Sequence, residues 1–387
     1  MTRQLPLQAD CSIMTPGPTQ VAENVRAALS LPCTNPDLDP AFYPFTRGIC
    51  SDLEEFFHAT DQEALILSGE GILGLEAAFA SLTEPGDRVL VLDNGVYGRG
   101  NADFVKLYGG TPVLYSKDPH VPLDPAALAA YLAQDHDFAY ASLVHCDTPS
   151  GILNDIGALL PILHRCGILT VVDAVSSAFG MPIDLGKEPA DILCLGSQKA
   201  LSAPPGLSML LVGPAAWDKM ARRKTPIASF YANLPAMRDY FKKQWFPYTM
   251  PSADLNGLRQ ALNNVLNDPG IFERHRKIAK AVRKALVSSG LTLYESAGYS
   301  DTVSVFLVPE GTTDRAILDG CRKEGVMFAG SFGFLSGKVI RIGHMGENAR
   351  KEKVADALRV LDKVLGDLHV PLQADLEQVF LSELSSS

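Results

Sequence analysis

The sequence lacks the features of a membrane protein and of a nucleic-acid-binding protein. No apolar run approaches the roughly 18 residues of a membrane span. No cluster of lysine and arginine offsets the formal net charge of −10. An acidic balance of that size opposes binding to phosphate backbones. We therefore expect no membrane segment and no nucleic-acid partner.

Disulfide and zinc patterns are also absent. The seven cysteines are odd in number, scattered, and never spaced as C-x-x-C, which is typical of free thiols in a reducing cytoplasm. The first residues, Met1 to Pro6, contain no apolar stretch of a secretory signal. There is no low-complexity segment and no solenoid repeat. We expect a cytoplasmic enzyme that acts on small molecules without a metal.

Short apolar strands alternate with amphipathic helices in the first two thirds of the chain. The candidate strands are 64–67, 88–92, 112–115, 138–145, 169–172, 191–195 and 207–212, and one clear helix pattern covers 151–166. Such alternation predicts an α/β fold with a mostly parallel sheet that is covered on both faces. Ligands of these sheets bind at the carboxyl ends of the strands.

The pattern changes after about residue 255, where helices 254–266 and 271–289 begin an α+β segment. Its further elements are strands 291–294, 302–308, 326–329 and 338–342 and helices 313–324 and 348–365. At 387 residues the chain exceeds one ordinary core. We predict an N-terminal segment (1–20) that packs on the core, a large cofactor-binding domain (21–255) and a small C-terminal domain (256–387). We expect the tail from residue 370 to be weakly structured.

One short motif suggests a dinucleotide. Gly69, Gly71 and Gly74 form G-x-G-x-x-G between a strand pattern and a helix pattern, and Asp93 ends the next strand pattern. That is the fingerprint of an NAD-dependent dehydrogenase. Glu70 does not fit it, because the backbone N–H groups of such a loop serve to hold an anion.

Two titratable residues indicate a different chemistry. Asp173 follows strand 169–172, and Lys199 follows strand 191–195. A lysine in an apolar pocket loses its proton more easily and can form a Schiff base. Pyridoxal chemistry needs such a lysine, and it needs a carboxylate on the pyridine nitrogen. From position alone, a salt bridge or a pair of helix caps would account for these residues equally well.

The surrounding residues resemble the class V aminotransferases, in the branch of the alanine–glyoxylate aminotransferases. The matching segments are 16–19, 93–98, 145–151, 173–176, 196–206 and 338–343. They occur in the family's order and cover nearly the whole chain. The resemblance implies a fold-type I transferase of pyridoxal 5'-phosphate, with a seven-stranded mostly parallel sheet in the large domain. It also implies a homodimer with the active site at the subunit interface.

The resemblance assigns roles at the centre of the site. Lys199 would carry the cofactor as a Schiff base (aldimine) and then move the proton, and Asp173 would pair with the pyridinium nitrogen. Tyr97 would stack on the ring, because a flat cationic ring is attracted to an aromatic face, and Val175 would pack on the other face. The alternative for Tyr97 is an ordinary half-buried loop tyrosine.

Two further residues would complete the site. Thr148, by its place in the family's loop, would form a hydrogen bond near the ring hydroxyl. Arg341 lies between two isoleucines, so in a strand it points to the opposite face, where it would clamp the carboxylate of a keto or amino acid. The alternative for Arg341 is a solvated arginine at a sheet edge.

The phosphate site is where the sequence departs from the family. Members hold the phosphate with the loop that matches Ser68, Gly69 and Glu70, with the glutamine that matches Gln198, and with a threonine of the neighbouring subunit that matches Thr249. A tyrosine of that subunit also takes part, and its position is phenylalanine here. Glu70 replaces a small hydroxyl residue with a carboxylate, which would repel a phosphate by about 1 to several kcal/mol.

Glu70 would suit a hydroxymethyl group instead. One branch of the family, the pyridoxamine–pyruvate aminotransferases, uses unphosphorylated pyridoxamine as amino donor, binds pyridoxal at the same lysine and resembles this chain at Glu70. The alternative is that Glu70 points away and pairs with Arg47 or Arg99, leaving the phosphate to backbone N–H groups. The pyridoxamine branch also has a second arginine ahead of Arg341, and that position falls near Phe332.

We therefore predict a vitamin-B6-dependent aminotransferase that moves an amino group to a small 2-oxo acid, pyruvate or glyoxylate. Pyridoxamine–pyruvate transaminase is the favoured subtype, with Glu70 at the substrate, and an ordinary pyridoxal-phosphate alanine– or serine–glyoxylate aminotransferase is the alternative. A cysteine desulfurase would need a cysteine in a mobile loop, whereas Cys321 lies in a helix pattern. An NAD-dependent dehydrogenase would leave Lys199, Asp173 and Arg341 without roles.

Overall fold

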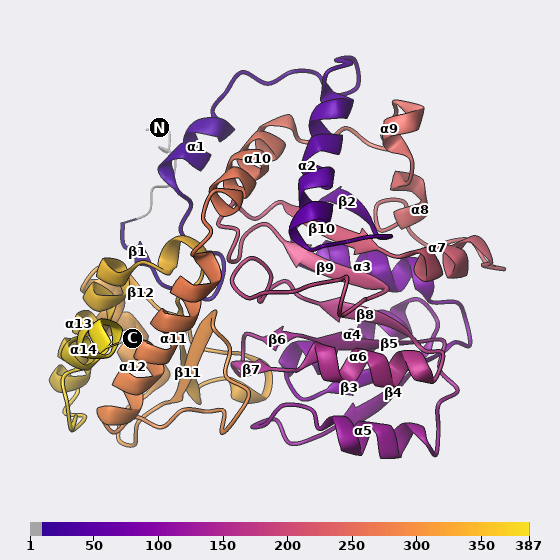
Figure 1. The fold of residues 1–387 in the computed structure, drawn as a ribbon. Helices are drawn as coiled ribbons and strands as arrows, with labels where there is room; N and C mark the ends of the chain where they lie inside the picture. The colour runs from indigo at the N-terminus through magenta and orange to yellow at the C-terminus, as the bar shows by residue number, and fades with distance from the viewer. Residues whose placement is uncertain (1–9, 387) are drawn as a thin grey trace, which may run out of the picture.

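A seven-stranded sheet forms the centre of the protein, which is described from residue 10 to residue 386 by a computed structural model (Figure 1). The strands lie in the order β2-β10-β9-β8-β5-β3-β4. They are β2 (Glu63–Ser68), β3 (Arg88–Asp93), β4 (Thr111–Ser116), β5 (Tyr140–Val144), β8 (Leu169–Asp173), β9 (Ile192–Gly196) and β10 (Leu207–Val212). Only β10 runs in the opposite direction to the other six strands. The predicted α/β fold with a mostly parallel sheet is confirmed.

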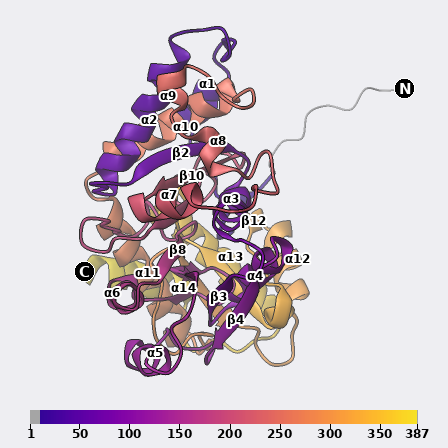
Figure 2. The ribbon, with the colours of Figure 1, turned by 90° about the vertical axis from the view of Figure 1, so that its right-hand side faces the viewer.

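The central strands are apolar because the sheet is covered on both faces. Every residue of β5, β9 and β10 is buried, as expected for strands between two layers of helices. Figure 2 shows the helices distributed around the sheet. The helices of this part are α1 (Glu23–Leu29), α2 (Phe42–Phe56), α3 (Gly71–Leu82), α4 (Val96–Leu107), α5 (Pro125–Leu132), α6 (Ile156–Arg165), α7 (Pro214–Ala221), α8 (Leu234–Met237), α9 (Tyr240–Lys243) and α10 (Ser252–Leu266).

A second apolar core lies beside the sheet, among the orange and yellow elements of Figure 1. Its helices and strands are α11 (Ile271–Ser288), β11 (Val303–Leu307), α12 (Asp314–Lys323), β12 (Val326–Met327), β13 (Val339–Gly343), α13 (Lys351–Asp367) and α14 (Leu376–Ser386). Near the N-terminus, β1 (Ser12–Ile13) pairs in parallel with β12, and Met14 is buried in the same core. The domain limits at residues 20 and 255 stay a prediction.

Three local predictions are wrong. The helix expected over 151–166 begins only at Ile156, because the small hairpin of β6 (Cys146–Asp147) and β7 (Ile152–Leu153) comes first. Segment 291–294 forms a single bridge, Leu293 to Phe306, rather than a strand. The tail is not weakly structured, since α14 inserts Leu376 and Phe380 into the second core. The expectation about a secretory signal concerns Met1 to Pro6, which lie outside the described residues.

No helix between residues 10 and 386 combines the length and the apolar character needed to cross a membrane.

We predict that Phe380→Ala destabilises the protein by about 3–5 kcal/mol, because it removes a fully buried ring from the second core. Gln378→Ala is the matched control, since Gln378 is exposed on the same helix. The free energy of unfolding in a denaturant titration measures both. Equal, small effects of the two substitutions would mean that α14 does not belong to the core.

Candidate active site

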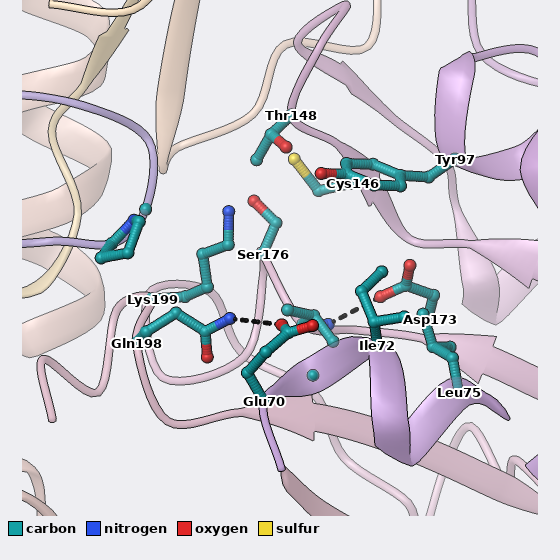
Figure 3. A pocket seen from close by; sticks show the side chains of 14 residues that line it. Glu70, Ile72, Leu75, Tyr97, Cys146, Thr148, Asp173, Ser176, Gln198 and Lys199 are labelled. Atoms are coloured by element: carbon teal, nitrogen blue, oxygen red, sulfur yellow. Dashed lines mark hydrogen bonds between the residues drawn. The ribbon is translucent and has the colours of Figure 1, made fainter. Parts of the chain in front are cut away.

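A pocket of about 570 Å³, measured to its open mouth, lies at the carboxyl ends of β8 and β9 and at the start of α3 (Figure 3). This is the sheet edge where ligands of parallel sheets bind. The residues that line it are Gly17, Pro18, Glu70, Gly71, Ile72, Leu75, Tyr97, Cys146, Thr148, Asp173, Val175, Ser176, Gln198 and Lys199.

Lys199 is buried beneath the N-terminal segment. Its ammonium Nζ donates a hydrogen bond to the carbonyl oxygen of Pro16, and the Thr19 hydroxyl donates to the Lys199 carbonyl at 2.9 Å. A Cβ atom on Gly17 would overlap the end of the lysine side chain, so only glycine allows this close approach. Burial, helped by the positive charge of Arg341, lowers the pKa of Lys199 to about 8. The amine therefore loses its proton far more readily than an exposed lysine.

Asp173 ends β8 and is buried at the opposite side of the pocket. Its Oδ1 accepts a hydrogen bond from the backbone N–H of Val175 at 3.0 Å. Burial raises the pKa of Asp173 to about 6, against the lowering effects of that hydrogen bond and of the positive charge of Lys199. No ion pair joins Asp173 to Lys199 within residues 10–386, so the simple salt bridge does not form. Both groups remain available to a ligand between them.

Tyr97 stands on the first turn of α4, and Asp147 holds that turn in place. The Asp147 carboxylate accepts hydrogen bonds from the backbone N–H groups of Val96 at 3.3 Å and Tyr97 at 2.9 Å. It thus caps α4 from another segment, which a carboxylate does well because the N-terminus of a helix is electropositive. A Cβ on Gly95 would overlap this carboxyl group. Sequence reasoning gave Asp147 no role, because the contact spans 50 residues of chain.

Glu70 lies at the N-cap of α3, but its side chain caps nothing. Its Oε2 instead accepts a hydrogen bond from Nε2 of Gln198 at 2.9 Å, inside the pocket. Arg47 forms an ion pair with Glu54. Arg99 forms one with the carboxylate of Asp93. The suggested pairing of Glu70 with either arginine is therefore wrong.

Arg341 is half-buried in β13, between two buried isoleucines. Its Nε donates to the carbonyl oxygen of Gly330 at 2.6 Å, and its Nη1 donates to that of Thr148 at 3.5 Å. Nη2 has no hydrogen bond to any residue in the described range. Arg341 is thus held against the loop that carries Thr148, unlike a solvated arginine at a sheet edge.

The remaining predicted residues divide into two groups. Thr148, Val175 and Gln198 line the pocket, whereas Ser68 and Gly69 lie in its supporting loop, where the Gly69 N–H donates to the Gly206 carbonyl at 2.7 Å. Thr249 is exposed and donates to Asp37 at 2.8 Å, away from this pocket. Residues that line the pocket and that sequence reasoning gave no role are Gly17, Pro18, Ile72, Leu75, Cys146 and Ser176, whereas Gly71 belongs to the glycine motif.

The pocket has polar atoms that no described residue satisfies. The Ser176 hydroxyl and Oε1 of Gln198 are buried without a hydrogen-bond partner. Buried polar groups are normally paired, so these atoms fit a ligand that carries polar substituents. A buried amine, a facing carboxylate and an aromatic side chain complete a set of groups that suits a pyridoxal-type ring. Fold and site together define a fold-type I enzyme of vitamin B6 chemistry.

The comparisons with known proteins give the family. The model of the class V aminotransferases matches residues 42–327, so the chain belongs to this family and is a transaminase that acts on small molecules. The family fold implies a cofactor of the pyridoxal phosphate type. This family assignment overturns the dinucleotide interpretation of the glycine motif. The Asp93 carboxylate accepts hydrogen bonds from Arg99 and Ser116 instead.

Three known proteins are similar to this chain in sequence or in structure. It is 35% identical over 331 residues to a pyridoxamine–pyruvate transaminase of Mesorhizobium japonicum, covering 84% of each chain. It is 31% identical over 360 residues to an alanine–glyoxylate aminotransferase of Callithrix jacchus, covering 90% of this chain and 86% of that one. The crystal structure of pyridoxamine–pyruvate aminotransferase from Mesorhizobium loti superposes with a TM-score of 0.92 at 32% identity, covering 99% of both chains.

We predict that Lys199 of the cofactor-free protein captures pyridoxal in a pH-dependent way, governed by its pKa of about 8. Below that pH the amine is protonated and has no lone pair, so capture should rise with pH through about 8 and level off above it. Borohydride trapping followed by peptide mapping measures the labelled fraction.

Lys187 is the internal control, because it is 81% exposed and Asp184 raises its pKa. Its labelling should begin at clearly higher pH than that of Lys199. The same pH profile at both lysines would contradict a special environment of Lys199.

Proposed function

We propose that this chain transfers the amino group of pyridoxamine to a small 2-oxo acid such as pyruvate, with the vitamin held at Lys199. The position of Glu70 carries the proposal. Its carboxylate is part of the pocket and is fixed there by Gln198. Without Glu70, this loop at the N-terminus of α3 would favour the binding of a phosphate, because a helix N-terminus attracts anions.

Electrostatics favours the unphosphorylated vitamin. Two like charges at about 4 Å repel by about 1 kcal/mol in water and about 4 kcal/mol at the effective dielectric of a protein surface. A hydroxymethyl group carries no charge, and it can donate a hydrogen bond to the Glu70 carboxylate. The described residues that line the pocket offer one cation, Lys199, and its amine is needed for the reaction. Pyridoxal or pyridoxamine is therefore a better match to Glu70 than the phosphate ester.

The residues then divide the work. When bound, the pyridine ring supplies an electron sink for the carbon that gains or loses the amino group. Asp173 would keep the ring nitrogen protonated, since its carboxyl group is ionised when the pH exceeds its pKa of about 6. Lys199 would move the proton at the reacting carbon, and Tyr97 would orient the ring by stacking. Arg341 would bind the carboxylate of the oxo acid through its free Nη2.

A homodimer in the cytoplasm is part of the proposal. Four aromatic side chains are exposed in the segment before Thr249, at Phe230, Tyr231, Phe241 and Trp245. Phe230 and Tyr231 contact each other edge to face at 5.9 Å, and exposed apolar side chains in contact are typical of an interface. A second subunit seated there would bring its Thr249 toward the site of the first. The role of Thr249 rests on that assembly.

The second candidate function is an alanine– or serine–glyoxylate aminotransferase with pyridoxal phosphate as resident cofactor. The 31% identity to an alanine–glyoxylate aminotransferase favours it. Mass spectrometry and phosphate analysis of the chromophore separate the two functions. Full occupancy by the phosphate ester, without turnover of free pyridoxamine plus pyruvate, would overturn the first.

In either case Lys199→Ala should abolish the visible absorption of the protein.

We predict that Glu70→Ser reverses the preference between the two forms of the vitamin. It removes the repelling carboxylate and offers a hydroxyl, so affinity for pyridoxal phosphate should rise by at least about fivefold relative to pyridoxal. Glu76→Ser is the control, because Glu76 lies on the same helix and bonds Tyr108 instead of lining the pocket. Spectrophotometric titration of both forms measures the ratio. An unchanged ratio in Glu70→Ser would remove Glu70 from the recognition of the vitamin.

A further inference from the structure

One buried hydroxyl of the pocket has no hydrogen-bond partner in the described part of the chain. Ser176 is only 5% exposed, and its Oγ forms no hydrogen bond with any residue from 10 to 386. The neighbouring Ser177 is also buried, yet its Oγ donates to the Ala174 carbonyl at 3.4 Å, which is a usual local bond of a serine in a turn. The turn after β8 thus uses the hydroxyl of Ser177 and leaves that of Ser176 to the pocket, which Ser176 lines.

The thiol beside Ser176 is committed to other groups. Cys146 lines the same pocket, and its Sγ donates to Oγ of Ser300 at 3.2 Å. Oγ of Ser300 lies in turn 2.8 Å from Oγ1 of Thr302. Burial raises the pKa of the Cys146 thiol, against the lowering effects of the hydroxyls of Ser300 and Ser176. The thiol is therefore neutral, and it offers Ser176 no charged acceptor.

The order of the substituents on the vitamin ring directs its phenolic oxygen toward Ser176. In the proposed function, ring position 4 faces Lys199, the ring nitrogen faces Asp173, and the hydroxymethyl group of position 5 faces Glu70. The 3-hydroxyl is the other neighbour of position 4, so it lies beside Lys199 on the side away from Glu70. Figure 3 shows the Ser176 hydroxyl directed away from Glu70 and toward the side of Thr148.

We propose that Ser176 is a further binding residue for the vitamin, which donates a hydrogen bond to the phenolic oxygen at ring position 3. This inference rests on the proposed function, because Lys199, Asp173 and Glu70 set the orientation of the ring. A phenolic oxygen accepts more than one hydrogen bond, so Ser176 and the predicted donor Thr148 can serve it together. When the phenol is ionised, the bond is charge-assisted and stronger than a neutral one.

A contact at this oxygen has particular weight for a vitamin without a phosphate. A phosphate could anchor the ring at the N-terminus of α3. The unphosphorylated form lacks that anchor, so the polar groups on the edge of the ring must carry its recognition. Glu70 would bind the hydroxymethyl group, and Ser176 would bind the phenolic oxygen on the other side of position 4. A site that forms a hydrogen bond with a substrate hydroxyl rejects an analogue that lacks it.

Equilibrium binding of two vitamin analogues tests the proposal without any turnover. Pyridoxine has a hydroxymethyl group at position 4, so it cannot form a Schiff base with Lys199, and 3-deoxypyridoxine differs from it only by lacking the phenolic oxygen. Ser176→Ala should weaken the binding of pyridoxine about three- to tenfold, as expected for the loss of one hydrogen bond. It should leave the dissociation constant of 3-deoxypyridoxine unchanged. Calorimetric titration of the full-length protein, freed of bound vitamin by dialysis, measures both constants.

Ser177→Ala is the matched control, because Ser177 is buried next to Ser176 but is not among the residues that line the pocket. It should change the dissociation constant of neither analogue. The ultraviolet absorption of bound pyridoxine gives a second measurement, since it reports whether the phenol is ionised. A hydrogen-bond donor favours the ionised form, so the phenol should ionise at lower pH in wild type than in Ser176→Ala.

The outcomes separate the inference from the proposed function. If Ser176→Ala weakens both analogues equally or neither, if Ser177→Ala has the same effect, or if the phenol ionises at the same pH in both proteins, the role of Ser176 is overturned. If wild type binds only the 5'-phosphates of the two analogues, the proposed function fails, and the same comparison made with the phosphates decides the role of Ser176. If wild type binds neither form, both fail.

Discussion

The removal of one lysine from water is the constraint on which the site depends. A buried ammonium is unfavourable unless it is compensated or loses its proton, and among residues 10–386 the Lys199 ammonium has only a backbone carbonyl for a partner. Several distant parts of the chain are needed to keep it buried. The end of β9 supplies the residue, the N-terminal segment covers it, and Gly17 leaves room for it. Arg341, from the second core, adds positive charge that disfavours the protonated form further.

Two carboxylates near helix N-termini contribute to the site in different ways. Asp147 satisfies backbone donors of α4 and thereby fixes Tyr97. Glu70, at the N-cap of α3, leaves the backbone donors of α3 alone and turns to Gln198. The first carboxylate is structural, whereas the second keeps its negative charge available in the pocket. Two carboxylates near helix N-termini therefore have different roles, and the direction of each side chain decides which.

Much of the fold and the centre of the site could be predicted from sequence, because they follow from local patterns. Strands buried on both faces read as apolar runs, and Asp173 and Lys199 stand directly after two of them. What could not be predicted depends on contacts across the chain. The bond of Gln198 to Glu70 spans 128 residues. The tail helix α14 has a serine-rich end. It is stabilised by the packing of its two buried residues in the second core rather than by intrinsic helix propensity.

The pairing of β1 with β12 has a practical consequence for anyone who trims the chain. Residues 12 and 13 form a strand in the second core, and within the next six residues the same segment passes over Lys199 and bonds the residues around it. This N-terminal segment contributes no strand to the seven-stranded sheet, so it could be mistaken for a dispensable extension. A shortened form that began after residue 20 would keep every strand of the sheet, yet it would lose the segment that covers Lys199, and the pKa of the amine would rise toward that of an exposed lysine. The minimal catalytic unit is thus longer than the minimal folded sheet.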